Sequence, residues 1–258
     1  MAHTSIGFIG GGRVTRIMLG GWQRQGHLPE RIVVSDPNVE NLAKLQADFP
    51  SIETALNDNR AAAAQDIVFI GLHPPAFAGA LDEIKASLKP TALVVSLAPK
   101  VSIAKLSAAL GTDKIARLIP NAPSIVNAGY NPVAFAAGLS AAGRAVLCEW
   151  LSILGDSPEV DEAKLEAYAI LTAMGPTYLW FQLYELQAVS EAFGLTPQEV
   201  SIGLEAMVKG TVQTMTTAQL SSADVMDLIP VKPLGEDEAA IKGFYHTRLE
   251  ALYAKLKS

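Results

Sequence analysis

A glycine-rich turn near the start of the 258-residue chain has the residue types and spacing of a phosphate-binding loop. The apolar stretch Ile6–Ile9 is a candidate strand, and three glycines lead from it into a helical pattern. Glycine permits a tight turn, and it lets a diphosphate approach the backbone, where helix N–H groups and the helix dipole attract anions. The alternative is a flexible turn that binds nothing. The pattern predicts a dinucleotide contact at Gly10, Gly11, Gly12, Arg13 and Val14.

An acidic residue, Asp36, follows the second candidate strand, Ile32–Val34. An acid at this place can accept hydrogen bonds from the ribose hydroxyls of adenosine and would repel a 2′-phosphate. No lysine or arginine follows at once, because the next residues are Pro37 and Asn38. The pattern favours NAD over NADP, with Arg13 as a residue that could still accept a phosphate. The alternative is an ordinary turn aspartate before a proline.

Further candidate contacts follow the apolar stretch Ile67–Ile70, where the chain continues as Leu72, His73 and Pro74. The carboxyl ends of parallel strands are where open α/β sheets bind ligands. We therefore expect these three residues beside the cofactor. A histidine can also serve as an acid or base, but a lone histidine at a strand end is often only structural.

These candidate sites require a parallel sheet to position them. The expected strands are β-branched and nearly continuous in apolar character, which is typical of strands covered on both faces. Helix-length segments separate them, which implies right-handed crossovers. We predict an α/β chain in which residues 1–155 form a doubly wound (Rossmann) parallel sheet that binds the dinucleotide. The expected strands are Ile6–Ile9, Ile32–Val34, Ile67–Ile70, Leu93–Val95 and Ile115–Leu118.

The pattern becomes helical throughout over residues 156–258, where we predict an all-helical domain for dimerisation and substrate binding. Thr196 and Glu199 have the spacing of a capping box at the start of a long helix. Residues 167–184 carry no charge, but Gly175 and Pro176 interrupt them, so we interpret this segment as a buried helix and not as a membrane span. A thin helical domain cannot hide so much apolar surface alone, which predicts a homodimer through these helices.

Composition excludes several other classes of protein. Half of the residues are hydrophobic and 18% are charged, which is unlike a disordered chain. The formal charge of −6 disfavours a nucleic-acid partner, because phosphate binding needs clustered lysine and arginine. The single Cys148 excludes a disulfide framework within the chain and a cysteine-rich metal site. No secretory pattern precedes the first strand, so we expect a cytoplasmic protein with a small-molecule substrate and no membrane contact.

Five motifs follow one another along the chain, at residues 6–12, 72–74, 116–123, 160–162 and 172–178. In this order they resemble the pyrroline-5-carboxylate reductase family, and the Pro-Asn-x-Pro element within residues 116–123 is the most specific of them. The resemblance implies a homodimer with its active site between the cofactor and the helices of both subunits. It also implies hydride transfer from NAD(P)H to the C=N carbon of a cyclic imino acid, which gives proline, and it puts Asn121 beside the nicotinamide.

The chain departs from the family pattern where the substrate would bind. Met174 replaces a small hydroxyl residue, and the family's Pro-Gly-Gly-Thr-Thr loop has become residues 230–234, without its glycines and threonines. An anionic substrate needs fixed donors or a cation, and the candidates that remain as catalytic residues are Thr177, Tyr178 and Lys232. The alternatives are a solvated loop lysine and a tyrosine that packs in the core.

The sequence thus predicts an NAD(P)H-dependent reductase that acts on a cyclic imino acid or on a related imine or keto compound. Two alternatives stay open. One is a catalytically silent dimer that binds a dinucleotide as a sensor or scaffold, which the altered substrate loop would suit. The other is a reductase that uses a deazaflavin instead of nicotinamide.

Overall fold

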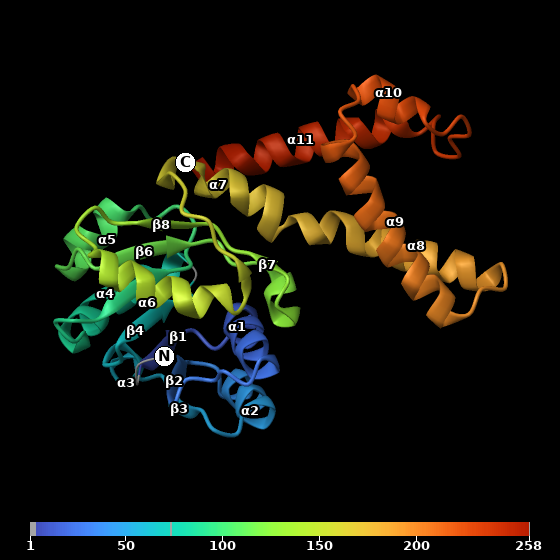
Figure 1. The fold of residues 1–258 in the computed structure, drawn as a ribbon. Helices are drawn as coiled ribbons and strands as arrows, with labels where there is room; N and C mark the ends of the chain where they lie inside the picture. Colours follow the sequence, from blue (N-terminus) through green and yellow to red (C-terminus); the bar gives the residue numbers. More distant parts are fainter. Residues whose placement is uncertain (1–3, 73, 258) are drawn as a thin grey trace. The chain divides into compact units, whose positions relative to one another are not determined.

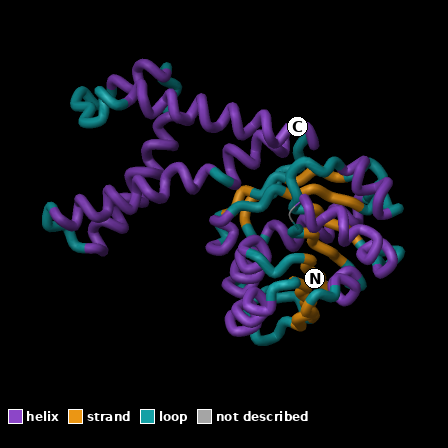
Figure 2. Tube along the Cα trace, turned by 180° about the vertical axis from the view of Figure 1, so that it is seen from behind, coloured by secondary structure: helices purple, strands orange, loops and turns teal. Residues whose placement is uncertain are grey.

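The computed structural model describes residues 4–72 and 74–257 and divides into two compact units. The sheet unit comprises Met1–Met174 with Tyr253–Ser258, and the helical unit comprises Gly175–Leu252. All the strands belong to the sheet unit (Figures 1 and 2). The division between these compact units comes after Met174, and the segment that precedes it packs on the sheet unit: Leu165 is buried there, and Glu166 pairs with Arg117.

The sheet unit contains a seven-stranded sheet in the order β3-β2-β1-β4-β5-β6-β8. Its neighbouring strands are parallel, except that β8 is antiparallel to β6. All five expected strands are confirmed, whereas β3, β8 and the small parallel pair β7–β9 were not expected. The bounds are β1 Ser5–Ile9, β2 Arg31–Asp36, β3 Glu53–Leu56, β4 Ile67–Ile70, β5 Leu93–Ser96, β6 Ile115–Leu118, β7 Gly129–Tyr130, β8 Val133–Phe135 and β9 Gly155–Asp156.

Helices cover both faces of this sheet, as the apolar strands require. Successive strand residues point to opposite faces, so Phe8 joins one core cluster and Ile9 the other. The cluster of Phe8 includes side chains of α1, α2 and α6, and that of Ile9 includes side chains of α3, α4 and α5. The helices of the sheet unit are α1 Arg13–Arg24, α2 Val39–Asp48, α3 Asn59–Ala63, α4 Pro74–Ser87, α5 Ile103–Leu110, α6 Ala141–Ser152, η1 Ala122–Val126 and η2 Glu162–Lys164 (both 3₁₀), α7 Leu165–Tyr168 and the π-helix η3 Ala169–Ala173.

Aromatic packing holds α1 on the sheet, and α1 carries the glycine-rich turn at its start. Trp22 is fully buried, its ring lies 6.0 Å from that of Phe8 and 5.4 Å from that of Trp150 on α6, and its Nε1 donates to the Trp150 carbonyl at 2.9 Å. Burial of one such ring contributes about 2–3 kcal/mol. This packing fixes the axis of α1 and thereby the place where its first N–H groups point.

The helical unit confirms the predicted helices but not their predicted burial. Thr196 and Glu199 form both hydrogen bonds of the capping box that opens α9. None of the side chains described for α8 is buried, and Phe181 and Tyr184 are 68% and 71% exposed. The interpretation of residues 167–184 as a buried helix is therefore wrong for α8 within one chain, because this unit has too few helices to cover α8 on every side. The bounds are α8 Gly175–Ala192, α9 Pro197–Thr217, α10 Ser222–Asp227 and α11 Glu238–Lys257.

The same helices bear on the question of a membrane span. Within residues 4–72 and 74–257, no helix is both long enough and apolar enough to cross a bilayer. In α8 the cause is visible in the sequence, since Gln182, Glu185 and Gln187 interrupt its apolar residues.

Candidate active site

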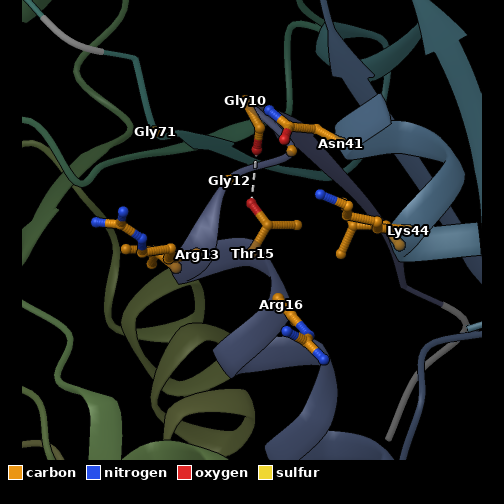
Figure 3. Close-up of a pocket in the computed structure, with 11 residues that line it drawn as sticks. Gly10, Gly12, Arg13, Thr15, Arg16, Asn41, Lys44 and Gly71 are labelled. Atoms are coloured by element: carbon orange, nitrogen blue, oxygen red, sulfur yellow. Dashed lines mark hydrogen bonds between the residues drawn. The ribbon is translucent and has the colours of Figure 1, made fainter. Parts of the chain in front are cut away.

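A cavity of about 580 Å³ opens at the start of α1, at the carboxyl edge of the sheet (Figure 3). It brings together the five residues of the predicted phosphate-binding loop and adds side chains of α2. The lining residues are Gly10, Gly11, Gly12, Arg13, Val14, Thr15, Arg16, Asn41, Lys44, Leu45 and Gly71.

The loop needs glycine at two positions for two different reasons. Gly10 has a φ of +109°, and a Cβ atom there would lie 2.9 Å from the carbonyl oxygen of Gly71, so the turn itself requires glycine. At Gly12 an added Cβ would meet no described atom within 4 Å. The space in front of Gly12 is therefore open, as the approach of a diphosphate to the backbone demands.

The start of α1 offers N–H groups to a ligand. Gly12 is the N-cap of α1, and no side chain of the described residues caps it. The first four N–H groups of any helix lack intrahelical acceptors, and the dipole adds partial positive charge at this end. Thr15 is buried, and its Oγ1 donates to the Gly10 carbonyl at 2.6 Å, which ties the helix to the loop (Figure 3).

Asp36, at the end of β2, holds the same loop through hydrogen bonds to its carboxylate. Its side chain is only 7% exposed. Oδ2 accepts a hydrogen bond from the Gly11 N–H at 2.7 Å, and Oδ1 accepts one from the Asn38 N–H at 2.7 Å and a longer one from Asn41 Nδ2 at 3.4 Å. The carboxylate thus serves the backbone of the loop, and its contact with a ribose stays a prediction.

Positive charge surrounds the cavity. Arg13 and Lys44 are exposed and lie on either side of Thr15 in Figure 3. Arg16 also lines the cavity, and its Nε pairs with Asp48 at 2.9 Å. Lys44 and its neighbour Asn41 were missed by the sequence analysis. Their spacing of three residues on a predicted helix would have placed them on one side of it.

The remaining predicted cofactor contacts in the sheet unit are Leu72, His73, Pro74 and Asn121. Leu72 is half-buried and packs against the core cluster that contains Ile9, and Pro74 begins α4. His73 lies outside the described residues. Asn121 follows β6 and is 7% exposed, and its side-chain amide contacts backbone groups of the chain itself. The position of Asn121 beside a nicotinamide stays a prediction.

The three predicted catalytic residues belong to the helical unit. Thr177 and Tyr178 lie in the first turn of α8, and the ring of Tyr178 meets that of Tyr245 edge to face with centroids 5.9 Å apart. Burial, and to a lesser degree Tyr245, raises the pKa of Tyr178 above its usual range, so the phenol keeps its proton at neutral pH.

Lys232 lies in the loop between α10 and α11 and is exposed. It lines a second cavity, of about 670 Å³, whose other side chains are mostly apolar. Lys232 therefore places a positive charge at an apolar surface, which suits an organic anion. The cavity is lined by Leu186, Met226, Lys232, Pro233, Leu234, Gly235, Glu238, Ile241 and Lys242.

Known proteins resemble this chain over nearly its whole length. A pyrroline-5-carboxylate reductase of Escherichia coli (strain K12) is 30% identical over 256 residues, which cover 96% of this chain and 94% of that protein. The enzyme of the same name from Pseudomonas aeruginosa is 29% identical over 254 residues, which cover 98% and 92%. Residues 5–100 match a family model described as NADP oxidoreductase coenzyme F420-dependent.

Solved structures agree in fold. The structure of a pyrroline-5-carboxylate reductase from Coxiella burnetii has a TM-score of 0.69 at 27% identity and covers 99% of this chain and 95% of its own. A Plasmodium falciparum pyrroline carboxylate reductase with NADP bound has a TM-score of 0.77 over 100% of this chain and 98% of its own, and its 18% identity supports the fold alone. Together with the glycine-rich loop and the two-unit architecture, the identity to the Escherichia coli enzyme shows that this chain belongs to the pyrroline-5-carboxylate reductase family.

Proposed function

We propose that the protein is an NAD(P)H-dependent reductase that transfers a hydride to the C=N carbon of a cyclic imino acid or of a related imine or keto compound. The observation that carries this proposal is the cavity at Gly10–Gly12, with its open backbone, in a chain that is 30% identical to a pyrroline-5-carboxylate reductase. In this proposal residues 1–155 bind the dinucleotide, and residues 156–258 bind substrate and dimerise.

The residues of the loop fit a dinucleotide by charge and by shape. The open face of Gly12 and the first N–H groups of α1 would hold the diphosphate, and Arg13 would neutralise part of its charge. A bound nicotinamide supplies the hydride. The chain's own contribution is then to position two molecules and to exclude water, which accounts for much of the acceleration in such reactions.

The proposed catalytic residues would act on the substrate's charges. Tyr178 keeps its proton, so it can donate a hydrogen bond to the imine nitrogen or to a carboxylate. Thr177 precedes it on α8 and offers a second hydroxyl. Lys232 carries the positive charge that an anionic substrate needs where the family's loop residues are absent. The substrate-binding groups therefore differ in type from those of the family pattern.

Both nicotinamide cofactors suit the loop, and the charges admit a 2′-phosphate. The sequence alone favours NAD, since Asp36 would repel that phosphate. In the structure Asp36 faces Gly11 and Asn38, whereas Arg13 and Lys44 line the open cavity. The proposal therefore includes NADPH as a substrate on an equal footing with NADH.

The exposed apolar face of α8 supports a homodimer. Phe181 and Tyr184 are mostly exposed on a helix whose described side chains include no buried one. Contiguous exposed apolar surface of this kind marks contact sites. We expect a dimer by sedimentation at micromolar concentration, and a monomer there would contradict the assignment. A cytoplasmic location also belongs to this proposal.

Two measurements test the function. Calorimetry with NADH and with NADPH should show binding, and the absence of both would refute the nucleotide site. Oxidation of NAD(P)H with pyrroline-5-carboxylate and with a panel of other imines and keto acids should show turnover. Binding without turnover on the whole panel would support the silent dimer instead. The match of residues 5–100 to a model described as coenzyme F420-dependent makes a deazaflavin competitor a necessary arm of the binding experiment.

A further inference from the structure

Buried polar side chains form a cluster in the segment that follows β6, and they are not among the residues that line the nucleotide cavity. Asn121 is 7% exposed, and Ser124 and Asn131 are fully buried. The Asn121 N–H donates to Asn131 Oδ1 at 3.1 Å, and Ser124 Oγ donates to the same oxygen at 2.9 Å. Burial of polar groups costs free energy unless they are hydrogen-bonded. The bonds within this cluster offset that cost and hold its side chains in one geometry.

The bonds of Asn121 determine which way its side-chain amide points. The Tyr130 N–H can only donate, and it meets the side chain of Asn121 at 3.1 Å, so the oxygen Oδ1 must face Tyr130. The nitrogen Nδ2 then faces the other way and donates to the Thr172 carbonyl at 3.3 Å. The amide thus links the loop after β6 to the π-helix η3, which is 51 residues further along the chain.

The carbonyl that Asn121 reaches lies where the helix ends. Thr172 is in the last turn of η3, and the last carbonyls of any helix lack intrahelical donors. Within η3 the Met174 N–H donates to the Ala169 carbonyl five residues back, which is the register of a π-helix. The Asn121 side chain meets the Thr172 carbonyl from a different segment of the chain. The sheet unit ends at Met174, directly after this turn.

We propose that Asn121 is a positioning residue whose side-chain Nδ2 caps the Thr172 carbonyl, and that it thereby fixes the end of η3, from which the proposed substrate-binding residues Thr177 and Tyr178 follow. The assignment rests on the proposed function for its effect on catalysis, but its structural part does not depend on that function. It also gives Asn121 a role other than direct contact with the cofactor through its side chain.

Hydrogen exchange tests the structural part directly. The Met174 N–H donates to the Ala169 carbonyl at 2.9 Å, so exchange of this amide reports opening of η3. Asn121→Asp keeps an oxygen for Tyr130 and removes the donor to Thr172. A neutral hydrogen bond contributes 0.5–1.5 kcal/mol, so we expect exchange in residues 169–174 to rise about three- to tenfold. Should the aspartate variant fail to fold, Asn121→Ala removes the donor to Thr172 without an added charge, and it also removes the acceptor for the Tyr130 N–H.

The matched control is Ser124→Ala, which removes a hydroxyl from the same cluster but leaves the bond to Thr172 intact. It should leave the exchange of residues 169–174 relative to the rest of the sheet unit unchanged.

Kinetics separate positioning from cofactor contact. With an imine that the wild type reduces, Asn121→Asp should raise KM for the imine about three- to tenfold and leave the Kd of NADPH unchanged. Unchanged exchange at Met174, or a Kd of NADPH that rises while exchange stays constant, would overturn the proposal. If the wild type reduces no imine at all, the proposed function fails, and the exchange measurement still decides the role of Asn121.

Discussion

Removal of Arg117 should destabilise the protein far more than removal of any exposed cation. The Arg117 side chain is 4% exposed on β6, where Nη2 pairs with Glu166 at 2.8 Å and Nη1 with Glu162 at 3.0 Å. Glu166 is 8% exposed, whereas Glu162 is 31% exposed and also accepts from the Ile103 N–H. Arg117→Met therefore leaves one carboxylate buried without its cation, which costs about 3–5 kcal/mol.

That cost is a large part of the 5–15 kcal/mol that stabilises a typical domain. Urea unfolding followed by circular dichroism should show a markedly lower midpoint for Arg117→Met. The double variant Arg117→Met/Glu166→Leu should recover most of the loss, because apolar groups of similar volume often replace a buried pair at little cost. Arg31→Met breaks the exposed pair with Glu53 and serves as the control, with no measurable shift expected. A loss below about 1 kcal/mol for Arg117→Met, or a double variant no better than the single one, would refute the reasoning.

Three further outcomes test other parts of the structure. Gly12→Ala should lower the free energy of unfolding by no more than about 1 kcal/mol, because an added Cβ meets no described atom within 4 Å but alanine is a poorer N-cap than glycine. Calorimetry should show at least tenfold weaker NADPH binding, a loss of about 1.4 kcal/mol. Lys44→Glu should weaken NADPH more than NADH, and equal weakening would argue against a 2′-phosphate near Lys44. Burial opposes ionisation of Asp66, but hydrogen bonds from Lys89 and Ser5 outweigh it and lower the pKa of Asp66 from 3.8 to about 2. Because the folded protein stabilises the ionised carboxylate, Asp66 contributes to the free energy of unfolding above pH 3.8, and this contribution disappears as the pH falls toward 2. The Asp66 side chain is 40% exposed, so the contribution is only about 1 kcal/mol. Asp66→Asn should remove this part of the pH dependence of unfolding.

The sequence predicts the centre of the sheet but not its edges. The five expected strands are continuous apolar stretches because helices cover them on both faces. The edge strand β3, Glu53–Leu56, has partly exposed side chains, so no buried pattern marks it. The other edge strand, β8, has only three residues and pairs antiparallel with β6. Neither its length nor its direction follows from local residue types.

The candidate site was predictable where its chemistry is local. Gly10 and Gly12 are recognisable because a turn and an anion both need glycine within a few residues. Asn121 shows the opposite case, since its bonding partner Thr172 lies 51 residues away and only the folded chain brings them together. The family resemblance names Asn121 as a candidate, but it does not determine which group the Asn121 amide contacts. The burial of α8 was overestimated for a related reason, because a stretch without charged residues does not reveal how many neighbours a helix has.

The placement of buried polar groups separates a constant part of this protein from a variable one. Asp36 ends β2 and Asn121 follows β6. Both side chains accept hydrogen bonds from the backbone of loops that follow strands of the sheet. Each side chain satisfies a backbone N–H of its loop, so these bonds hold the loop geometry. The departures from the family pattern in the proposed substrate site, Met174 and 230–234, take no part in these hydrogen bonds. Because Asp36 holds the nucleotide loop and these departures lie elsewhere, we predict a shifted imine preference with ordinary NADPH affinity.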